Sequence, residues 1–144
     1  MVKAMRQILT GGVLALLLAE AGTVMADERE LVALPPMMQE HMLGNMREHL
    51  ETIDALLERL ALGELDAAAE LAEARLGMSS LQGHGAEHLA RFMPAPMQAF
   101  GTSMHRAASR FARTAEEGEP LAAYRALGEI TRACVGCHAA YRIR

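Results

Sequence analysis

Aromatic side chains are scarce in this sequence, which has no Trp, three Phe and two Tyr. Its 144 residues suit a single domain. A domain of this size with so little aromatic volume builds only a thin core. Two interpretations follow. A large flat cofactor would fill the deficit, or helices rich in Ala, Leu and Met would pack tightly without one.

Alternating runs of Val, Ile and Thr are also absent, so no strand is expected. Helical periodicity, with Gly or Pro at the breaks, instead predicts four helices, over 35–62, 64–76, 96–117 and 120–144. The stretch 79–95 is expected to be mostly loop, with room for a short helix. Four amphipathic helices with mostly short connections predict an all-α chain folded as an antiparallel up-down-up-down four-helix bundle.

Apolar residues recur at steps of three and four along the long helices, which predicts one buried stripe on each. The stripe of the first helix comprises Leu43, Met46, Leu50, Ile53, Leu57 and Leu60. That of the third comprises Met97, Phe100, Met104, Ala107, Phe111 and Thr114. That of the fourth comprises Leu127, Thr131, Cys134, His138 and Tyr141.

The first 26 residues have the pattern of a secretory signal peptide. Lys3 and Arg6 precede an apolar run over 8–19, and Ala26 ends a possible cleavage site. About a dozen apolar residues fall short of the ~20 that a spanning helix needs, which disfavours an uncleaved membrane anchor. We therefore expect cleavage before Asp27, export to the periplasm, and a single domain over 27–144 that is not in the membrane.

Basic charge is not in excess either. The whole chain carries a net charge of −4. The leader contributes a net +1, so the mature domain would carry −5. This balance argues against nucleic acid as a partner, because such proteins present a basic stripe. It is compatible with a protein that meets a basic surface on a partner.

The only two cysteines belong to the motif Cys134-Val135-Gly136-Cys137-His138, which is C-x-x-C-H. Positions i, i+3 and i+4 share one face of a helix, so both thiols and the imidazole are expected to point together into the bundle. That arrangement suits attachment of haem c by two thioether bonds, with His138 as the proximal iron ligand. A thioredoxin-like site expects a βαβ unit, a zinc site expects a second Cys pair, and a plain disulfide does not explain the adjacent His.

Residues 134–142 read C-V-G-C-H-A-A-Y-R, which is similar to the C-x-x-C-H-x-x-Y-R ending of the cytochrome c-prime family, the class II cytochromes c. The resemblance is specific only in the last eleven residues, although the layout agrees over the mature chain. It implies a periplasmic electron carrier or gas-binding haem protein, often a homodimer. It also implies that Tyr141 and Arg142 pack near the haem edge.

The family divides into high-spin members with five-coordinate iron and low-spin members with a Met ligand from the first helix. In an antiparallel bundle, the level of His138 corresponds to Gly44 on the first helix, with Met42 and Met46 on either side. Met46 lies on the apolar stripe and is the preferred distal ligand. Met42 is the alternative, and Met42 and Leu43 would line the pocket. Both methionines could instead be simple core residues. The family usually has Arg one turn before the distal residue, whereas this chain has Met38 or Met42.

The remaining histidines are expected to be exposed or hydrogen-bonded, with His49 the first candidate for an exception. They show no tight spacing that would indicate a copper or zinc site. These are His41, His49, His84, His88 and His105.

The sequence thus predicts a periplasmic monohaem c-type cytochrome that transfers one electron through a covalent haem with His/Met ligation. No acid–base or nucleophile constellation is present, so no enzyme is expected. The alternative within the family is a five-coordinate haem protein that binds nitric oxide or carbon monoxide. A third hypothesis is a helical adaptor closed by a disulfide, without haem.

Overall fold

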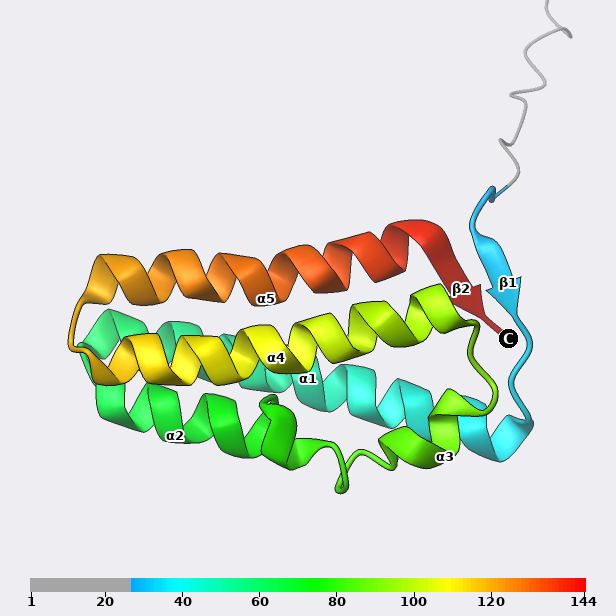
Figure 1. The fold of residues 1–144 in the computed structure, drawn as a ribbon, viewed down its shortest axis with the longest axis horizontal. Helices are drawn as coiled ribbons and strands as arrows, with labels where there is room; N and C mark the ends of the chain where they lie inside the picture. Colours follow the sequence, from blue (N-terminus) through cyan, green and yellow to red (C-terminus); the bar gives the residue numbers. More distant parts are fainter. Residues whose placement is uncertain (1–26) are drawn as a thin grey trace, which may run out of the picture.

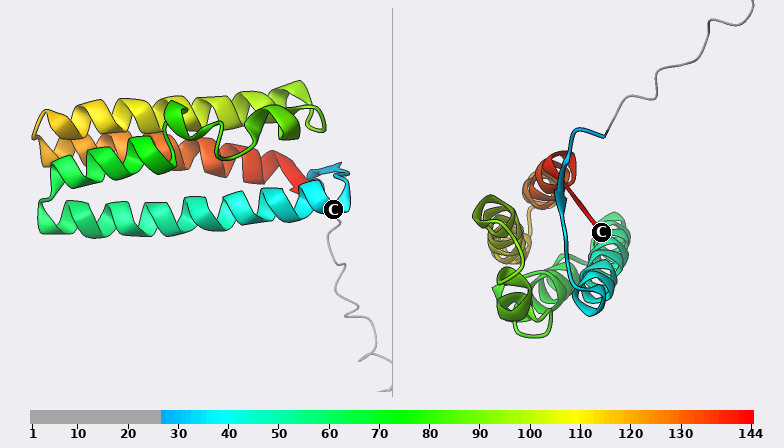
Figure 2. Two further views of the ribbon diagram at one scale, coloured as in Figure 1. Left: turned by 90° about the horizontal axis from the view of Figure 1, so that it is seen from below. Right: turned by 90° about the vertical axis from the view of Figure 1, so that its right-hand side faces the viewer.

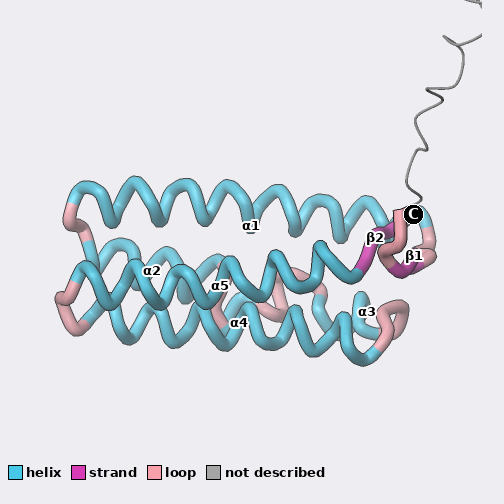
Figure 3. The backbone as a smooth tube through the Cα atoms, turned by 90° about the horizontal axis from the view of Figure 1, so that it is seen from above, coloured by secondary structure: helices cyan, strands magenta, loops and turns pink. Residues whose placement is uncertain are grey.

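The computed structural model describes residues 27–144, so the expected signal peptide lies outside the described residues. In chain order the elements are β1 Glu30–Val32, α1 Pro36–Leu62, α2 Leu65–Arg75, the 3-10 helix η1 Met78–Ser80, α3 Ala86–Ala90, α4 Ala95–Glu116, α5 Pro120–Ala140 and β2 Tyr141–Ile143. Helices make up most of this part, which confirms the prediction of a mainly α-helical chain (Figure 3). No helix among residues 27–144 has both the length and the apolar character needed to cross a membrane.

The long helices lie side by side, with α1 opposite in direction to α2 and α4 opposite to α5 (Figure 1). The closest packing is between α4 and α5, followed by α2 on α4 and α1 on α2. By contrast, α1 and α5 contact each other at only a few positions. The views along and across the helices show α1 set apart from α5 over much of its length (Figure 2).

Proline and glycine mark the helix ends as the sequence predicted. Pro36 and Pro120 occupy first-turn positions, where the missing N–H removes no intrahelical hydrogen bond. Gly63 ends α1 with φ 74°, and its N–H reaches the carbonyls of Arg59 and Leu60. Such a left-handed residue closes a helix at least cost when it is Gly.

Two short strands contradict the prediction that no strand would form. Residues 30–32 pair in parallel with residues 141–143, with Leu31 opposite Arg142. The last helix therefore ends at Ala140 and does not reach the C-terminus. Three residues are too few to show an alternating pattern, and the pairing brings together opposite ends of the described chain. Only tertiary contact could produce it.

The apolar side chains form two separate clusters. One, which we call the main core, runs between α1, α2, α4 and α5 and contains Leu56, Leu60, Leu76, Phe111, Leu127, Ile130 and many alanines. The other, which we call the methionine cluster, lies at the end of the molecule that carries β1, β2 and α3 (Figure 1). Its buried residues are Val32, Leu34, Met42, Leu89 and Met97. Its half-buried residues are Met38, Met46, Met93, Cys137, Tyr141 and Ile143.

The expected stripe of α1 is partly wrong. Leu43, Leu50 and Leu57 are exposed at 40, 70 and 45%, while the buried face consists of Met42, Asn45, Thr52, Leu56 and Leu60. The polar residues on this buried face are hydrogen-bonded, one to another segment and one within α1. Asn45 donates to the His84 carbonyl at 2.9 Å, and Thr52 donates to the Glu48 carbonyl at 2.8 Å.

The stripe of α4 agrees better with the structure. Met97, Met104, Ala107 and Phe111 are buried, and Phe100 and Thr114 are half-buried.

Candidate functional site

Cys134 and Cys137 lie one turn apart near the C-terminal end of α5, and both are half-buried. Cys134 packs against the main core, whereas Cys137 packs in the methionine cluster. The buried face of α5 is centred on Leu127, Ile130 and Ala133. The two thiols continue that face, so they lie together at the boundary between the two clusters.

The thiols are not joined to each other, and both cysteines are free. Cys134 Sγ donates a weak hydrogen bond to the Ile130 carbonyl at 3.4 Å. Burial raises the pKa of Cys134, and burial together with the neighbouring Cys134 raises the pKa of Cys137. Redox-active C-x-x-C pairs depend on a lowered thiol pKa, so these thiols lack the electrostatic setting of a disulfide-exchange site.

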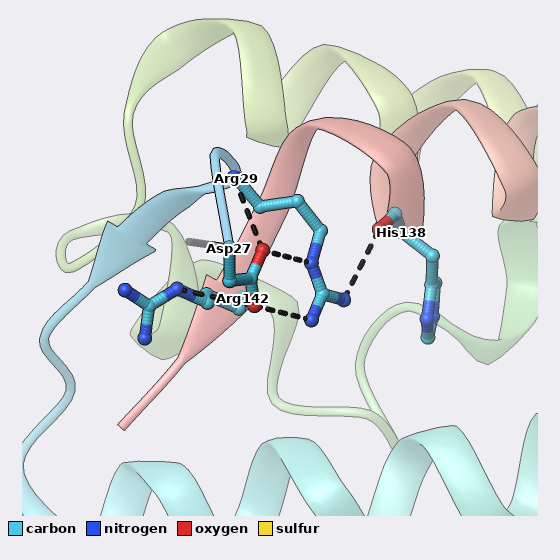
Figure 4. A network of polar contacts seen from close by, with 4 residues as sticks. All are labelled: Asp27, Arg29, His138 and Arg142. Atoms are coloured by element: carbon cyan, nitrogen blue, oxygen red, sulfur yellow. Dashed lines mark hydrogen bonds and ion pairs between the residues drawn. The ribbon is translucent and has the colours of Figure 1, made fainter. Parts of the chain in front are cut away.

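His138, expected to face inward, is an exposed residue. Figure 4 shows its ring extending from the last turn of α5 toward the side where α1 lies. Its backbone carbonyl accepts a 3.4 Å hydrogen bond from Arg29 Nη1. The ring is exposed because it projects from the edge of the buried face, where α1 and α5 make few contacts.

The other side of α5 at this level is closed by α4. A Cβ built on Gly136 would lie 2.6 Å from Cε1 of Phe100, so the Phe100 ring packs directly on the α5 backbone. The same ring lies edge-on to Tyr141 with centroids 6.5 Å apart. A flat group attached to the two thiols would therefore have to lie on the α1 side.

Methionines from α1 face this region. Met42 is buried and Met46 half-buried, and both share the methionine cluster with Cys137. Met38 also belongs to the cluster, whereas Met37 is 74% exposed. Leu43, expected to line the pocket, lies at the exposed edge.

Tyr141 and Arg142, both half-buried, belong to β2 and not to a helix. Arg142 Nε is buried without a hydrogen-bond partner, although it lies 3.4 Å from a carboxylate oxygen of Asp27. Asp27 also pairs with Arg29 at 2.7 Å (Figure 4). The hydrogen bonds from Arg29, aided by the charges of Arg29 and Arg142, lower the pKa of Asp27 to about 2. The side chains of Arg29 and Arg142 thus lie beside the last turn of α5, with the Asp27 carboxylate between them.

The structure also brings together three histidines that the sequence spacing did not connect. His49 of α1, His84 of the loop before α3 and His105 of α4 each place a ring nitrogen within 4.8 Å of the other two. Burial lowers the pKa of all three, and that of His49 falls to about 4 with help from the other two rings. His84 and His105 are buried but hydrogen-bonded, as one of the two expected states requires, and His49, whose buried Nε2 has no hydrogen-bond partner, is the exception.

The other two histidines behave as expected. His88 is exposed, and His41 is hydrogen-bonded through Nε2 to the His84 carbonyl at 2.8 Å. Sequence spacing missed the trio because its members come from three segments that only folding brings together.

None of the protein-family models, curated proteins and solved structures compared with this chain matches it.

Proposed function

We propose that residues 27–144 form a periplasmic monohaem c-type cytochrome that carries single electrons between redox partner proteins. In this proposal the four long helices form an antiparallel four-helix bundle, and haem c is attached through Cys134 and Cys137. The observation that carries the proposal is the position of these free thiols. They are half-buried on one face of α5, next to an imidazole and opposite methionines of α1.

Three features of the chain support the fit of such a group. First, α1 and α5 contact each other little, on the side toward which His138 extends. Second, the Phe100 ring fills the opposite side of the motif, against Gly136. Third, the buried Nε of Arg142 has an ion pair with Asp27 at 3.4 Å but no hydrogen bond, and a closer carboxylate would provide one. Haem c carries two propionate groups, and one of them would accept this hydrogen bond from Arg142.

In the proposed complex His138 would hold the iron of haem c as the proximal ligand, and Met46 would hold it as the distal ligand, with Met42 as the alternative. Bound haem c supplies an iron centre that alternates between the ferric and ferrous states. The chain sets the properties of that centre through its axial ligands, burial and neighbouring charges. Ligation by Met raises the reduction potential relative to a second His, and the apolar methionine cluster excludes water. Arg142 and Arg29 offset negative charge at the edge.

The test is to produce the protein in a host that attaches haem c and to measure its mass and visible spectrum. We expect a mass above that of the polypeptide by one haem. We also expect a low-spin spectrum with a weak far-red band from the Met–iron bond. A high-spin spectrum with rapid binding of carbon monoxide would favour the gas-binding alternative. An unmodified mass with a Cys134–Cys137 disulfide would overturn the cytochrome proposal.

A further inference from the structure

The three buried histidines lie outside the haem motif and have no part in the proposed electron transfer. The His49 and His84 ring centroids are 4.8 Å apart, those of His84 and His105 5.5 Å, and those of His49 and His105 5.8 Å. We propose that His49, His84 and His105 form a binding site for one Zn²⁺ ion.

Hydrogen bonds fix which nitrogen of two of the rings is free. His105 Nδ1 donates to the Leu76 carbonyl at 2.8 Å. The hydroxyl of Ser80 donates to the Gly77 carbonyl at 2.7 Å, so it can only accept from His84 Nδ1, 3.3 Å away. Both rings therefore carry a lone pair on Nε2. Imidazoles that bind metals usually donate their other N–H to a carbonyl or similar acceptor in this way.

His49 supplies the observation that points to a ligand. Its Nε2 is buried and has no hydrogen-bond partner. A buried polar atom without a partner costs about 1–3 kcal/mol, so natural structures rarely keep one without a reason. A metal ion between the three rings would bind this lone pair.

The loop that carries His84 is fastened to α1. The His84 carbonyl accepts hydrogen bonds from Asn45 at 2.9 Å and from His41 at 2.8 Å. The next residue, Gly85, has φ +60°, and a Cβ there would lie 2.8 Å from the His41 ring. Only Gly fits this turn without strain, so the backbone holds His84 in place before any ion arrives.

The donor set selects the class of metal. Three neutral imidazoles without a carboxylate suit zinc, copper or nickel and not magnesium or calcium. Tetrahedral zinc with bonds of about 2.05 Å places its nitrogens about 3.4 Å apart, so the present separations of up to 4.8 Å must shorten by as much as about 1.4 Å. A pocket of about 270 Å³ lined by Ser80, His84, Glu48 and Arg75 opens beside the trio. Of the three histidines only His84 lines this pocket, so an ion would reach the trio from solvent along the His84 ring.

The experiment uses the untagged protein as purified, treated with chelator and titrated with Zn²⁺ by calorimetry. We expect one site per chain and a rise in melting temperature of several degrees. His49→Leu is expected to weaken binding by about 100-fold or more, since even supporting residues of metal sites are worth 10–100-fold. The variant is expected to fold, because it removes a buried nitrogen that has no partner.

His84→Gln is expected to reduce binding as well, and His88→Gln is the matched control because His88 is exposed and outside the trio. The titration is repeated on the Cys134→Ser/Cys137→Ser variant, which has no thiol that could bind zinc. Retained binding there supports the histidine site whether or not the chain carries haem. Absence of zinc binding to the unmodified chain, equal binding by His49→Leu, or loss of binding only in the cysteine variant would overturn the proposal.

Discussion

The main core and the methionine cluster differ in how completely they are packed. Leu56, Leu76, Phe111 and Ile130 in the main core are 0% exposed, and alanines fill the space between them. The buried members of the methionine cluster retain 3–7% exposure, and more than half of the cluster is only half-buried. The two thiols of the motif lie where these regions meet.

Under the proposed function, this difference separates the part of the chain that stabilises the fold from the part that would hold the haem. The main core closes on itself with small residues, which is the packing that the second interpretation of the aromatic deficit describes. The methionine cluster remains incomplete, as the first interpretation requires. Flexible thioether side chains adapt to an irregular or changing surface, so they suit the part that a cofactor would cover.

The largest effect is expected from Cys134→Ser with Cys137→Ser. Without thiols no thioether bond can form, so covalent haem absorbance should vanish completely. The circular dichroism of the helices should remain, because the main core does not depend on these half-buried side chains. Haem that stays attached after denaturation and extraction would contradict the assignment of the motif.

Substitution of the two α1 methionines should separate ligation from packing. Met46→Ala should remove the far-red band and make the iron high-spin, whereas Met42→Ala should keep the band. Met42 is buried, so its truncation should lower the free energy of unfolding by about 2–4 kcal/mol. Spectra and urea titrations of both variants decide the matter, and the reverse pattern would make Met42 the ligand.

Phe111→Ala removes a side chain from the centre of the main core and should lower the free energy of unfolding by about 3–5 kcal/mol. The cost should be equal with and without haem, because this core is complete. Met97→Ala in the methionine cluster is the matched variant, and it should lower the free energy of unfolding by about 2 kcal/mol or more. It should cost less in the haem-free chain, where the looser cluster can collapse around the change. Chemical denaturation of each variant with and without haem measures the difference. A cost of Phe111→Ala that depends on haem would contradict the distinction between the main core and the methionine cluster.

Acid should destabilise the metal-free protein through the histidine trio. The pKa of His49 is about 4 in the fold, against 6.5 for an unperturbed His. Below pH 6.5 the unfolded chain binds a proton that the native His49 does not, so stability present above that pH is lost as the pH falls toward 4. The loss from His49 is at most about 3 kcal/mol. Thermal melts from pH 7 to 4 with chelator should show it, and His49→Leu should flatten the profile.

The smallest effect concerns the contact between α4 and α5 behind the motif. Gly136→Ala gains about 1 kcal/mol of helix propensity but presses on the Phe100 ring, and overpacking costs about 1–3 kcal/mol. We expect a net loss of roughly 1 kcal/mol. Gly101→Ala on α4 is the control, because nothing lies within 4 Å of its Cβ, and it should gain about 1 kcal/mol. Equal melting temperatures for the two variants would argue against the close packing of Phe100.

Local chemistry made the helices predictable. Pro36, Gly63 and Pro120 set helix ends through their own backbone preferences, so α1 and α5 begin and α1 ends where the sequence indicated. Side-chain burial was less predictable. Leu43 and Leu50 fit the helical period, yet the face carrying Asn45 and Thr52 is the buried one, and both of these side chains are hydrogen-bonded there.

By itself, the sequence determined the helical class, most of the helix boundaries and the grouping of two thiols on one turn, since each depends on residues within a few positions of one another. Only the tertiary structure decided the pairing of β1 with β2, the exposure of His138 and the meeting of His49, His84 and His105. These features join segments far apart in the chain. Their geometry depends on how α1, α4 and α5 pack, which no local spacing encodes.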